Sequence, residues 1–384
     1  MPAIDPLATD SLAPQAAPVP VPPASGRTTA PKFHRLIVRD VTRETPEAVS
    51  IAFEVPAALA SDYAFAPGQY LTLRATIEGE EVRRSYSICS GPDDAELRVA
   101  VKQIENGLFS GWVNAGLKAG DALEVMTPTG RFGLTEPGDG RLHVGFAAGS
   151  GITPILSIVR GVLSREPHSR FFLFYGNRAT ADILFREQLE DLKDRFLGRL
   201  SLFHVLSREE QDLPVLNGRL DGEKVRLLLT AMVPAAAVDH AFICGPEGMI
   251  AELEATLKDL GLAEDRIHAE RFVSAHGGKP RPAPVIVPGA PPAHRAALIV
   301  DGKRREVPVA EGESILDAAL RAGMDLPFAC KGGMCSTCRA RVVEGEAEME
   351  LNYSLEPWEV KAGFVLTCQA HPCSERVVVD FDQM

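Results

Sequence analysis

Four cysteines near the carboxyl end constrain this chain more than any other feature. Cys330, Cys335 and Cys338 follow a C-x4-C-x2-C spacing, and Cys368 lies about thirty residues further on. One loop therefore supplies three thiolates and a distant segment supplies the fourth, which is the ligand set of a [2Fe–2S] cluster. Two glycines between the first two cysteines let the loop backbone curl close to the metal. The spacing predicts an iron–sulfur site and a chain that moves electrons.

Two other uses of these cysteines compete with the cluster. A structural zinc site usually pairs two short cysteine knuckles, and this chain has only one. A disulfide framework needs a secreted context, but residues 1–31 have no basic start and no uninterrupted apolar stretch of the kind that a signal peptide has. The iron–sulfur interpretation is therefore preferred.

The charge and hydropathy of the chain disfavour several classes of function. Its 384 residues carry 40 Lys and Arg against 52 Asp and Glu, a formal net charge of −12. That balance argues against binding to nucleic-acid phosphates and to anionic membranes. No apolar run approaches the roughly eighteen residues of a membrane-spanning helix. We expect a cytoplasmic protein, because a reducing compartment keeps thiols available for iron.

The pattern of apolar and turn residues divides the chain into five parts, since its length exceeds that of one hydrophobic core. Residues 1–31, rich in Pro and Ala, are expected to form a disordered tail. Short alternating segments in 32–138 predict an antiparallel β-barrel. Nearly continuous apolar runs separated by helical patterns in 139–273 predict a doubly wound α/β domain. A Pro-rich linker, 274–295, precedes a β-grasp ferredoxin domain over 296–384.

The elements expected within these domains follow from the same patterns. In the last domain a helix opens at Ser314, with Asp317 three residues on. The α/β domain contains two helical stripes, one over 183–197 and one from 249 to 260. The expected strands are 34–38, 49–55, 70–75, 83–90, 97–104 and 122–126 in the barrel, 142–147, 171–175, 201–206 and 240–244 in the α/β domain, and 297–300, 306–309 and 376–381 in the last domain.

Two segments of the barrel offer the chemistry of a flavin site. Residues 84–87 supply a cation for a pyrophosphate, an aromatic face for a ring system and a neighbouring hydroxyl group. Residues 107–110 come before a short helix expected over 111–117, and a helix N-terminus attracts phosphate. Each segment alone is a weak signal, and residues 84–87 alone are compatible with a surface pair beside a packed tyrosine. Together, in this order and ahead of an α/β domain, they indicate a flavin.

With these motifs the chain resembles the ferredoxin–NADP reductase superfamily. The resemblance implies that Arg84 and Ser110 hold the FAD pyrophosphate, that Tyr86 stacks on the isoalloxazine, and that Ser87 hydrogen-bonds near flavin N5. FMN is the alternative flavin, but the complete phosphate loop favours FAD. The remaining residues assigned to the flavin are Ser85, Gly107, Leu108 and Phe109.

A second pair of loops resembles the pyridine-nucleotide site of the same superfamily. Gly149 and Gly151 permit a tight turn after the first parallel strand, and Thr153 and Pro154 open the following helix. Taken alone, this segment is compatible with a plain strand-to-helix turn. The resemblance makes it the pyrophosphate loop, and it places the nicotinamide at the end of a later strand, beside Cys244, Gly245 and Pro246.

Coenzyme choice is expected to depend on Arg178, Ser207 and Arg208. The resemblance implies that a hydroxyl group and guanidinium groups grip the 2′-phosphate of NADPH, and Arg suits that contact. The alternatives are ordinary surface charges and a relative that uses NADH. Phe272, at the end of the α/β domain, is the candidate aromatic that covers the flavin until nicotinamide displaces it. With Ser87 and Cys244, it completes the set assigned to catalysis.

Other residues carry weaker signals. Cys89 is expected to pack inside the barrel and Cys373 to be a free thiol. No His-x-x-x-His or Glu-x-x-His pair appears, so the chain lacks the ligand pattern of a di-iron oxygenase or zinc hydrolase. An acidic run after the cysteine loop is either a solvated face or a docking edge for a basic partner. Its members are Glu344, Glu346, Glu348 and Glu350.

Together these motifs predict a flavoprotein reductase in an electron-transport chain. Electrons pass from NADPH to FAD, then singly through the [2Fe–2S] cluster to an oxygenase. Residues 330–335, 349–356 and 363–370 most resemble the reductases of phenylacetyl-CoA epoxidase complexes, which implies di-iron epoxidase subunits as partners and a place in phenylacetate catabolism. Reductases of steroid 9α-hydroxylases and of Rieske-type oxygenases are the alternatives. An alternative of another class is a non-catalytic electron-relay or redox-sensing subunit.

Overall fold

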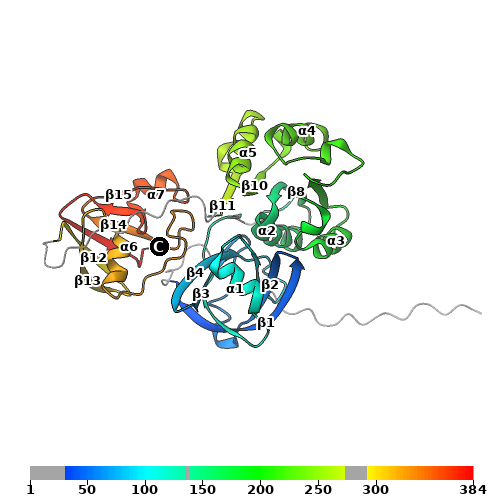
Figure 1. Ribbon diagram of the computed structural model, residues 1–384. Coiled ribbons are helices and arrows are strands. Elements are labelled where there is room, and N and C mark those ends of the chain that lie inside the picture. The colour runs from blue at the N-terminus through cyan, green and yellow to red at the C-terminus, as the bar shows by residue number, and fades with distance from the viewer. Residues whose placement is uncertain (1–30, 135, 137, 273–291, 384) are drawn as a thin grey trace, which may run out of the picture.

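The computed structural model describes residues 31–134, 136, 138–272 and 292–383, which form three domains (Figure 1). The predicted tail over 1–31 lies outside the described residues except at its last position. The predicted linker over 274–295 lies outside them except for residues 292–295, and a strand already begins at His294. Within the described ranges, no helix is long and apolar enough to cross a membrane.

The first domain is an antiparallel six-stranded sheet in the order β4-β3-β6-β1-β2-β5. The sheet curls until its edges meet, because Ile88 bridges Val99 and Cys89 N donates a hydrogen bond to Arg98 O at 2.9 Å. Alternate strand residues fill the interior, as a half-buried strand requires. The elements are β1 (Phe33–Thr45), β2 (Ala48–Glu54), β3 (Tyr70–Ile77), β4 (Glu80–Ser87), β5 (Leu97–Lys102), α1 (Leu108–Gly116) and β6 (Ala122–Met126).

The second domain is a parallel five-stranded sheet in the order β11-β10-β7-β8-β9. Helices α2 and α3 share one apolar cluster on one face, and α4 and α5 share another on the opposite face. The chain order reverses between β7 and β10, which is where doubly wound sheets bind nucleotides. The elements are β7 (Leu142–Ala148), α2 (Ile152–Arg165), β8 (Arg170–Asn177), α3 (Arg186–Arg195), β9 (Leu200–Leu206), α4 (Gly222–Met232), β10 (His240–Gly245), α5 (Glu247–Asp259) and β11 (Ile267–Arg271).

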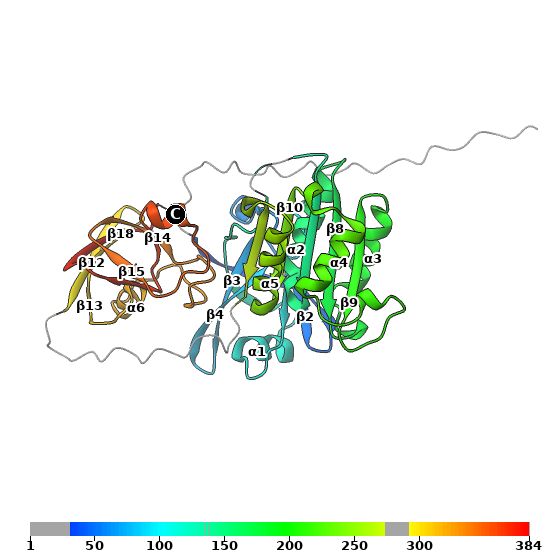
Figure 2. The same ribbon diagram turned by 90° about the horizontal axis from the view of Figure 1, so that it is seen from above.

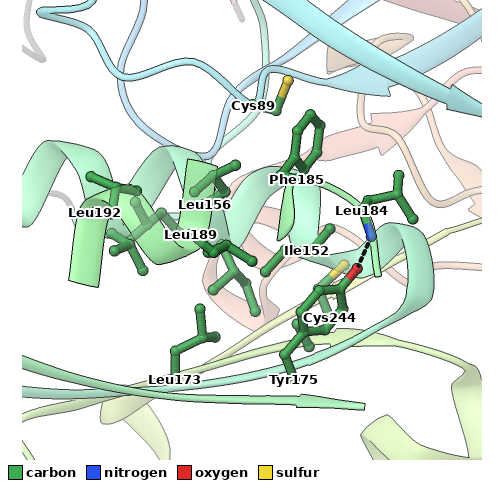
Figure 3. Packing of buried hydrophobic residues seen from close by; sticks show 14 of the residues in the cluster. Cys89, Ile152, Leu156, Leu173, Tyr175, Leu184, Phe185, Leu189, Leu192 and Cys244 are labelled. Atoms are coloured by element: carbon green, nitrogen blue, oxygen red, sulfur yellow. Dashed lines mark hydrogen bonds between the residues drawn. The ribbon is translucent and has the colours of Figure 1, made fainter. Parts of the chain in front are cut away.

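The helix predicted over 183–197 is shorter in the structure. Phe185 adopts a left-handed backbone with φ 59° immediately before α3. Ile183 and Leu184 are therefore not helical, and with Phe185 they are buried in the cluster that also holds α2 (Figure 3). Leu184 N donates a hydrogen bond to the Tyr175 hydroxyl at 3.3 Å. The apolar pattern was real, but it marked a buried turn rather than an extra helical turn.

The barrel and the α/β domain share this apolar cluster. Cys89 is buried, and it lies beside Phe185 of the second domain in this cluster (Figure 3). The prediction that Cys89 packs inside the barrel was therefore wrong, because it belongs to the core between the domains. A buried hydrogen bond of 2.7 Å from Ser157 Oγ to Ser90 O lies at the same junction.

The third domain has a five-stranded mixed sheet in the order β13-β12-β18-β14-β16 and a two-stranded sheet of β15 and β17. Its helix α6 begins after Ser314, whose hydroxyl accepts a hydrogen bond from Asp317 N at 3.1 Å, so this predicted cap is confirmed. The domain lies beside β3 and β4 of the barrel (Figure 2). The elements are β12 (His294–Val300), β13 (Lys303–Val309), α6 (Ile315–Arg321), β14 (Arg339–Glu344), β15 (Ala347–Met349), α7 (Pro357–Lys361), β16 (Phe364–Leu366), β17 (Ala370–Pro372) and β18 (Arg376–Asp380).

Candidate functional site

A cleft of about 1740 Å³ opens where the three domains meet. The barrel contributes the end of β4 and the start of α1, the α/β domain contributes β11 and the start of α2, and the third domain contributes the cysteine loop. The cleft thus brings together residues that are more than 200 positions apart in the sequence. Of the predicted site residues, those that line it are Arg84, Ser85, Tyr86, Ser87, Gly107, Leu108, Phe109, Ser110, Thr153, Phe272, Cys330 and Cys335.

Strand β4 presents the chemistry predicted for a flavin. Arg84 is exposed, and its Nη1 donates to the backbone oxygen of Arg83 at 2.7 Å, which leaves the other N–H groups of the guanidinium available to a ligand. The Tyr86 ring lies 5.8 Å from that of Phe109, with an interplanar angle of 33°. Burial raises the pKa of the Tyr86 hydroxyl group, so the ring stays neutral. An exposed guanidinium group and a neutral aromatic face therefore border one cleft.

The phosphate loop predicted at 107–110 is partly helical. Helix α1 begins at Leu108 rather than at 111, and Gly107 is its N-cap. The Ser110 hydroxyl donates to Gly107 O at 3.3 Å and accepts from Ile104 N at 3.2 Å, so it holds the loop against the helix. A Cβ on Gly107 would lie 2.4 Å from Ile104 Cγ1 and from Ser110 Oγ. The free N–H groups of the first turn are the phosphate donors that this geometry offers.

The two nucleotide loops of the α/β domain meet at the switch point of the sheet. Gly149 has φ +54°, which favours glycine. A Cβ on Gly151 would lie 2.1 Å from Cys244 O, so glycine is required for the first loop to touch the end of β10. Thr153 Oγ1 donates to Ser150 O at 3.0 Å and fixes the start of α2. Pro154 is buried in this first turn.

The second loop places Cys244 below the cleft rather than in its lining. Its side chain is fully buried in the cluster that contains Tyr175 and Ile152 (Figure 3). Burial raises the pKa of the Cys244 thiol well above its ordinary value. Gly245 packs against Met249, whose Cε would lie 2.5 Å from a Cβ at that position. The next residue, Pro246, is the N-cap of α5.

Glu270 is a site residue that the sequence interpretation missed. It lies on β11 opposite Cys244, lines the cleft, and accepts a hydrogen bond of 3.1 Å from Ser87 Oγ. Burial raises the pKa of Glu270 to about 8, so the carboxyl group holds a proton at neutral pH. Phe272, two residues on, lines the same cleft and is 37% exposed. In segment 270–272 the sequence pattern pointed only to the aromatic residue.

The residues predicted for the 2′-phosphate form a separate group at the same edge of the sheet. Arg208 N donates to Arg178 O at 2.7 Å, which joins the segments after β9 and β8. Ser207 Oγ donates to Asn177 O at 3.2 Å. The side chains of Arg178 and Arg208 are exposed, and among the described residues neither guanidinium group contacts a carboxylate. None of these residues lines the central cleft.

The four cysteines come together in two pairs. Cys330 and Cys335 interact with each other, as do the more buried Cys338 and Cys368. None of the four is in a disulfide. No three His, Cys, Asp or Glu side chains in the described ranges converge on a single metal position. Two pairs of thiols are the donor set that two irons need.

Backbone and side-chain groups are already directed at the sulfurs. The N–H of Gly332 lies 3.3 Å from Cys330 Sγ, and Gln369 Nε2 lies 3.7 Å from Cys368 Sγ. The thiol of Cys335 and neighbouring backbone N–H groups lower the pKa of Cys330 to about 6, which favours the thiolate that binds iron. Gly333, with φ +76°, would place a Cβ 2.9 Å from Leu351 O. The loop therefore fits a [2Fe–2S] cluster, as β4 and α1 fit FAD.

Family models match all three domains in order. Residues 36–133 match the oxidoreductase FAD-binding domain, residues 146–254 the oxidoreductase NAD-binding domain, and residues 298–373 the 2Fe-2S iron–sulfur cluster binding domain. The predicted cofactors, FAD and a [2Fe–2S] cluster beside a nicotinamide-nucleotide domain, are confirmed, and so is the three-part fold class.

Curated relatives share nearly the whole chain. A subunit of 1,2-phenylacetyl-CoA epoxidase from Escherichia coli is 47% identical over 91% of this chain and 98% of its own. The ferredoxin reductase component of 3-ketosteroid-9-alpha-monooxygenase from Rhodococcus rhodochrous is 34% identical over 90% of this chain and 96% of its own. Phthalate dioxygenase reductase has the same fold, with a TM-score of 0.52 at 21% identity, covering 91% of this chain and 98% of its own. The chain therefore belongs to the ferredoxin–NADP reductase superfamily, in the family of NAD(P)H-dependent FAD reductases with a C-terminal [2Fe–2S] ferredoxin domain that includes this 1,2-phenylacetyl-CoA epoxidase component.

Proposed function

We propose that this chain is the reductase component of a multicomponent oxygenase that epoxidises phenylacetyl-CoA. It takes electrons from NADPH and passes them through FAD and the [2Fe–2S] cluster to di-iron oxygenase subunits. The observation that carries the proposal is the position of the cysteine loop, since Cys330 and Cys335 line the same cleft as Tyr86 and Ser87. The 47% identity to a component of the Escherichia coli epoxidase supports the choice of oxygenase.

The residues around the cleft have separate tasks in this proposal. When bound, FAD would supply the acceptor for a hydride from NADPH, and the cluster would supply single-electron transfer. Arg84 and the first turn of α1 bind the pyrophosphate, and Tyr86 supports the flavin ring. The Ser87 hydroxyl and the protonated carboxyl group of Glu270 hold a proton beside the flavin ring system. Phe272 excludes water from the ring until the nicotinamide arrives.

The preference for NADPH rests on the group that contains Arg178, Ser207 and Arg208. Two exposed guanidinium groups on adjacent strand ends suit a dianionic 2′-phosphate, which NADH lacks. Their position away from the central cleft is consistent with this role, because the adenosine end of the coenzyme lies far from the nicotinamide.

The proposed setting is the cytoplasm. Four thiols that must remain free for iron favour a reducing compartment. A net charge of −12 disfavours nucleic acid and anionic membranes as partners. Glu344, Glu346 and Glu348 are exposed beside the ferredoxin sheet, and we assign them to docking of a basic surface on the oxygenase.

Reconstitution tests the proposal. The purified protein is expected to contain one FAD and two irons per chain, and zinc in place of iron would contradict the electron-exit role.

Mixed with the oxygenase subunits of the Escherichia coli epoxidase, the protein should couple NADPH oxidation to loss of phenylacetyl-CoA. Coupling to 3-ketosteroid 9α-hydroxylation instead would favour the second candidate, which the 34% identical relative supports. Failure to reduce ferricyanide with NADPH would favour a non-catalytic relay.

A further inference from the structure

Strand β4 carries two adjacent arginines that face different partners. Arg84 lines the flavin cleft, whereas Arg83 is 6% exposed because the ferredoxin domain covers it. Its Nη2 donates to Asp325 Oδ1 at 3.0 Å and its Nη1 to Leu326 O at 3.2 Å. The guanidinium carbon also lies 4.1 Å from the centre of the Phe328 ring. Arg83 therefore holds the segment that leads directly into the cysteine loop.

A second contact reaches the cysteine loop itself. Tyr70 lies on β3 directly opposite Ser87, the serine assigned to the flavin. The Tyr70 hydroxyl donates to Cys335 O and lies 2.8 Å from Thr337 Oγ1. Only 6% of Tyr70 is exposed. One side chain thus spans from the flavin strands to the backbone between two of the cluster cysteines.

A third contact lies on the far side of the loop. Arg131, in the segment after β6, makes a two-pronged ion pair with Glu359 of α7 at 2.6 and 2.7 Å. Glu359 is fully buried, and Arg339 of its own domain also binds it at 2.8 Å. The carboxylate therefore keeps one cation if Arg131 is removed. Arg131 is replaceable without leaving an unpaired buried charge.

We propose that Tyr70, Arg83 and Arg131 are positioning residues that clamp the cluster loop over the flavin cleft, and that flavin-to-cluster electron transfer takes place in this clamped arrangement. The inference rests on the electron path from FAD to the [2Fe–2S] cluster. In that step the flavin, already reduced by NADPH, loses one electron and the oxidised cluster gains one, and no bond between heavy atoms forms or breaks. The three contacts surround the loop at 325–328, 335–337 and 354–359, so they fix its orientation as well as its distance.

Arg131→Gln and Tyr70→Phe test the clamp in the holoprotein. Arg39→Gln is the matched control, because Arg39 is also a barrel arginine in an ion pair and its side chain is equally exposed at 46%. Anaerobic stopped-flow mixing with NADPH follows flavin absorbance and cluster absorbance separately. We expect unchanged flavin reduction in all three variants. Cluster reduction should slow about tenfold or more in Arg131→Gln, as loss of a charge-assisted pair implies, and should slow in Tyr70→Phe.

A structural readout separates the clamp from a general loss of activity. Hydrogen exchange of the backbone amides in 324–328 and 352–359 should quicken in Arg131→Gln and stay unchanged in Arg39→Gln. Arg131→Lys keeps the positive charge but cannot make the two-pronged contact of a guanidinium group. In this variant, cluster reduction should be faster than in Arg131→Gln, and its rate should depend more strongly on salt concentration than in the unmodified protein. Cluster reduction at the unmodified rate in both Arg131→Gln and Tyr70→Phe would overturn the inference. Absence of flavin reduction in the unmodified protein would contradict the proposed function instead.

Discussion

Ser87 and Glu270 lie 183 positions apart in the chain, and the hydroxyl of the first donates a hydrogen bond to a carboxyl oxygen of the second at 3.1 Å. The contact joins β4 of the barrel to β11, the last strand of the α/β domain. Burial raises the pKa of Glu270 to about 8. A proton is therefore held where the nicotinamide and flavin domains meet, and it is released as the pH rises through 8.

Replacement of Glu270 by Gln tests this proton. In the unmodified protein, flavin reduction by NADPH should slow as the pH rises through about 8, because the carboxyl group ionises. Glu270→Gln should reduce flavin about a hundredfold more slowly at pH 7, and its rate should not depend on pH in this range, since an amide does not supply the proton that accompanies the hydride when FAD becomes FADH₂. Stopped-flow rates between pH 6 and 10 measure this. Glu187→Gln, an exposed change on α3, is the control, and a pH limb that persists in Glu270→Gln would assign it to another group.

Replacement of Gly151 tests the contact between the two nucleotide loops. A methyl group there would lie 2.1 Å from Cys244 O, so the loops must separate. We expect Gly151→Ala to lower stability by about 1–3 kcal/mol and to weaken NADP⁺ binding. Gly248→Ala is the matched control, because a Cβ at that position meets nothing within 4 Å. Thermal melting and coenzyme titration measure both effects. If Gly151→Ala and Gly248→Ala had the same melting temperature and the same affinity for NADP⁺, the close approach of the two loops would not be required.

Local signals in the sequence predicted the domains and the cofactors. The cysteine spacing, the motif at 84–87 and the glycines at 149 and 151 are each contained in a few residues, and each constrains a loop whatever the rest of the chain does. The barrel strands were found by their alternation, although β1 extends to Thr45 rather than to 38. Register shifts in its pairing with β2, one between Val38 and Asp40, break the alternation on which the prediction relied.

Contacts between domains had no comparable signal. Glu270 meets Ser87, and Tyr70 meets Cys335, only where separate domains lie against each other. No periodicity links residues 183 or 265 positions apart. Cys89 is a further example. The apolar residues around it in the sequence predicted that it is buried, but the residues that bury it belong to the α/β domain, which comes later in the sequence. The residues that join the domains could therefore be identified only from the structure.

Coenzyme choice provides a further prediction. If Ser207 and Arg208 bind the 2′-phosphate, kcat/KM should favour NADPH over NADH, and Arg208→Ala should erase most of that preference. A charge-assisted contact contributes roughly 1.5–3 kcal/mol, or about ten- to a hundredfold. Arg266→Ala, an exposed arginine elsewhere on the same domain, should leave the ratio unchanged. Equal turnover with NADH and NADPH in the unmodified protein would mean that Ser207 and Arg208 do not select the 2′-phosphate.

Three neighbouring histidines predict how stability depends on pH. His143 and His240 lie 5.7 Å apart between ring centres, and His240 Nδ1 lies 3.0 Å from His268 Nε2. Burial lowers the pKa of all three, that of His240 to about 4. The unfolded chain therefore binds more protons below about pH 6.5, so stability should fall as the pH drops from 6.5 towards 4.

The test compares melting temperatures across that pH range. His240→Phe keeps a stacked ring that does not protonate, so its melting temperature should fall less steeply between pH 6.5 and 4. His294→Gln, in the ferredoxin domain, removes a histidine whose Nδ1 lies 2.8 Å from Ser374 O and that makes no ion pair among the described residues, so it should keep the slope of the unmodified protein. An identical slope in His240→Phe would place the acid sensitivity outside the stack.

The final prediction separates the two halves of the electron path. Cys335→Ser removes a cluster ligand, but the apolar clusters of the barrel and the α/β domain include no residue of the ferredoxin domain, so NADPH should still reduce the flavin and ferricyanide. Cytochrome c reduction and delivery to the oxygenase should collapse, because both depend on single-electron exit through the iron. Cys373→Ser, at the exposed thiol outside the cluster set, is the control. Intact oxygenase-coupled activity in Cys335→Ser would mean that electrons leave from the flavin itself.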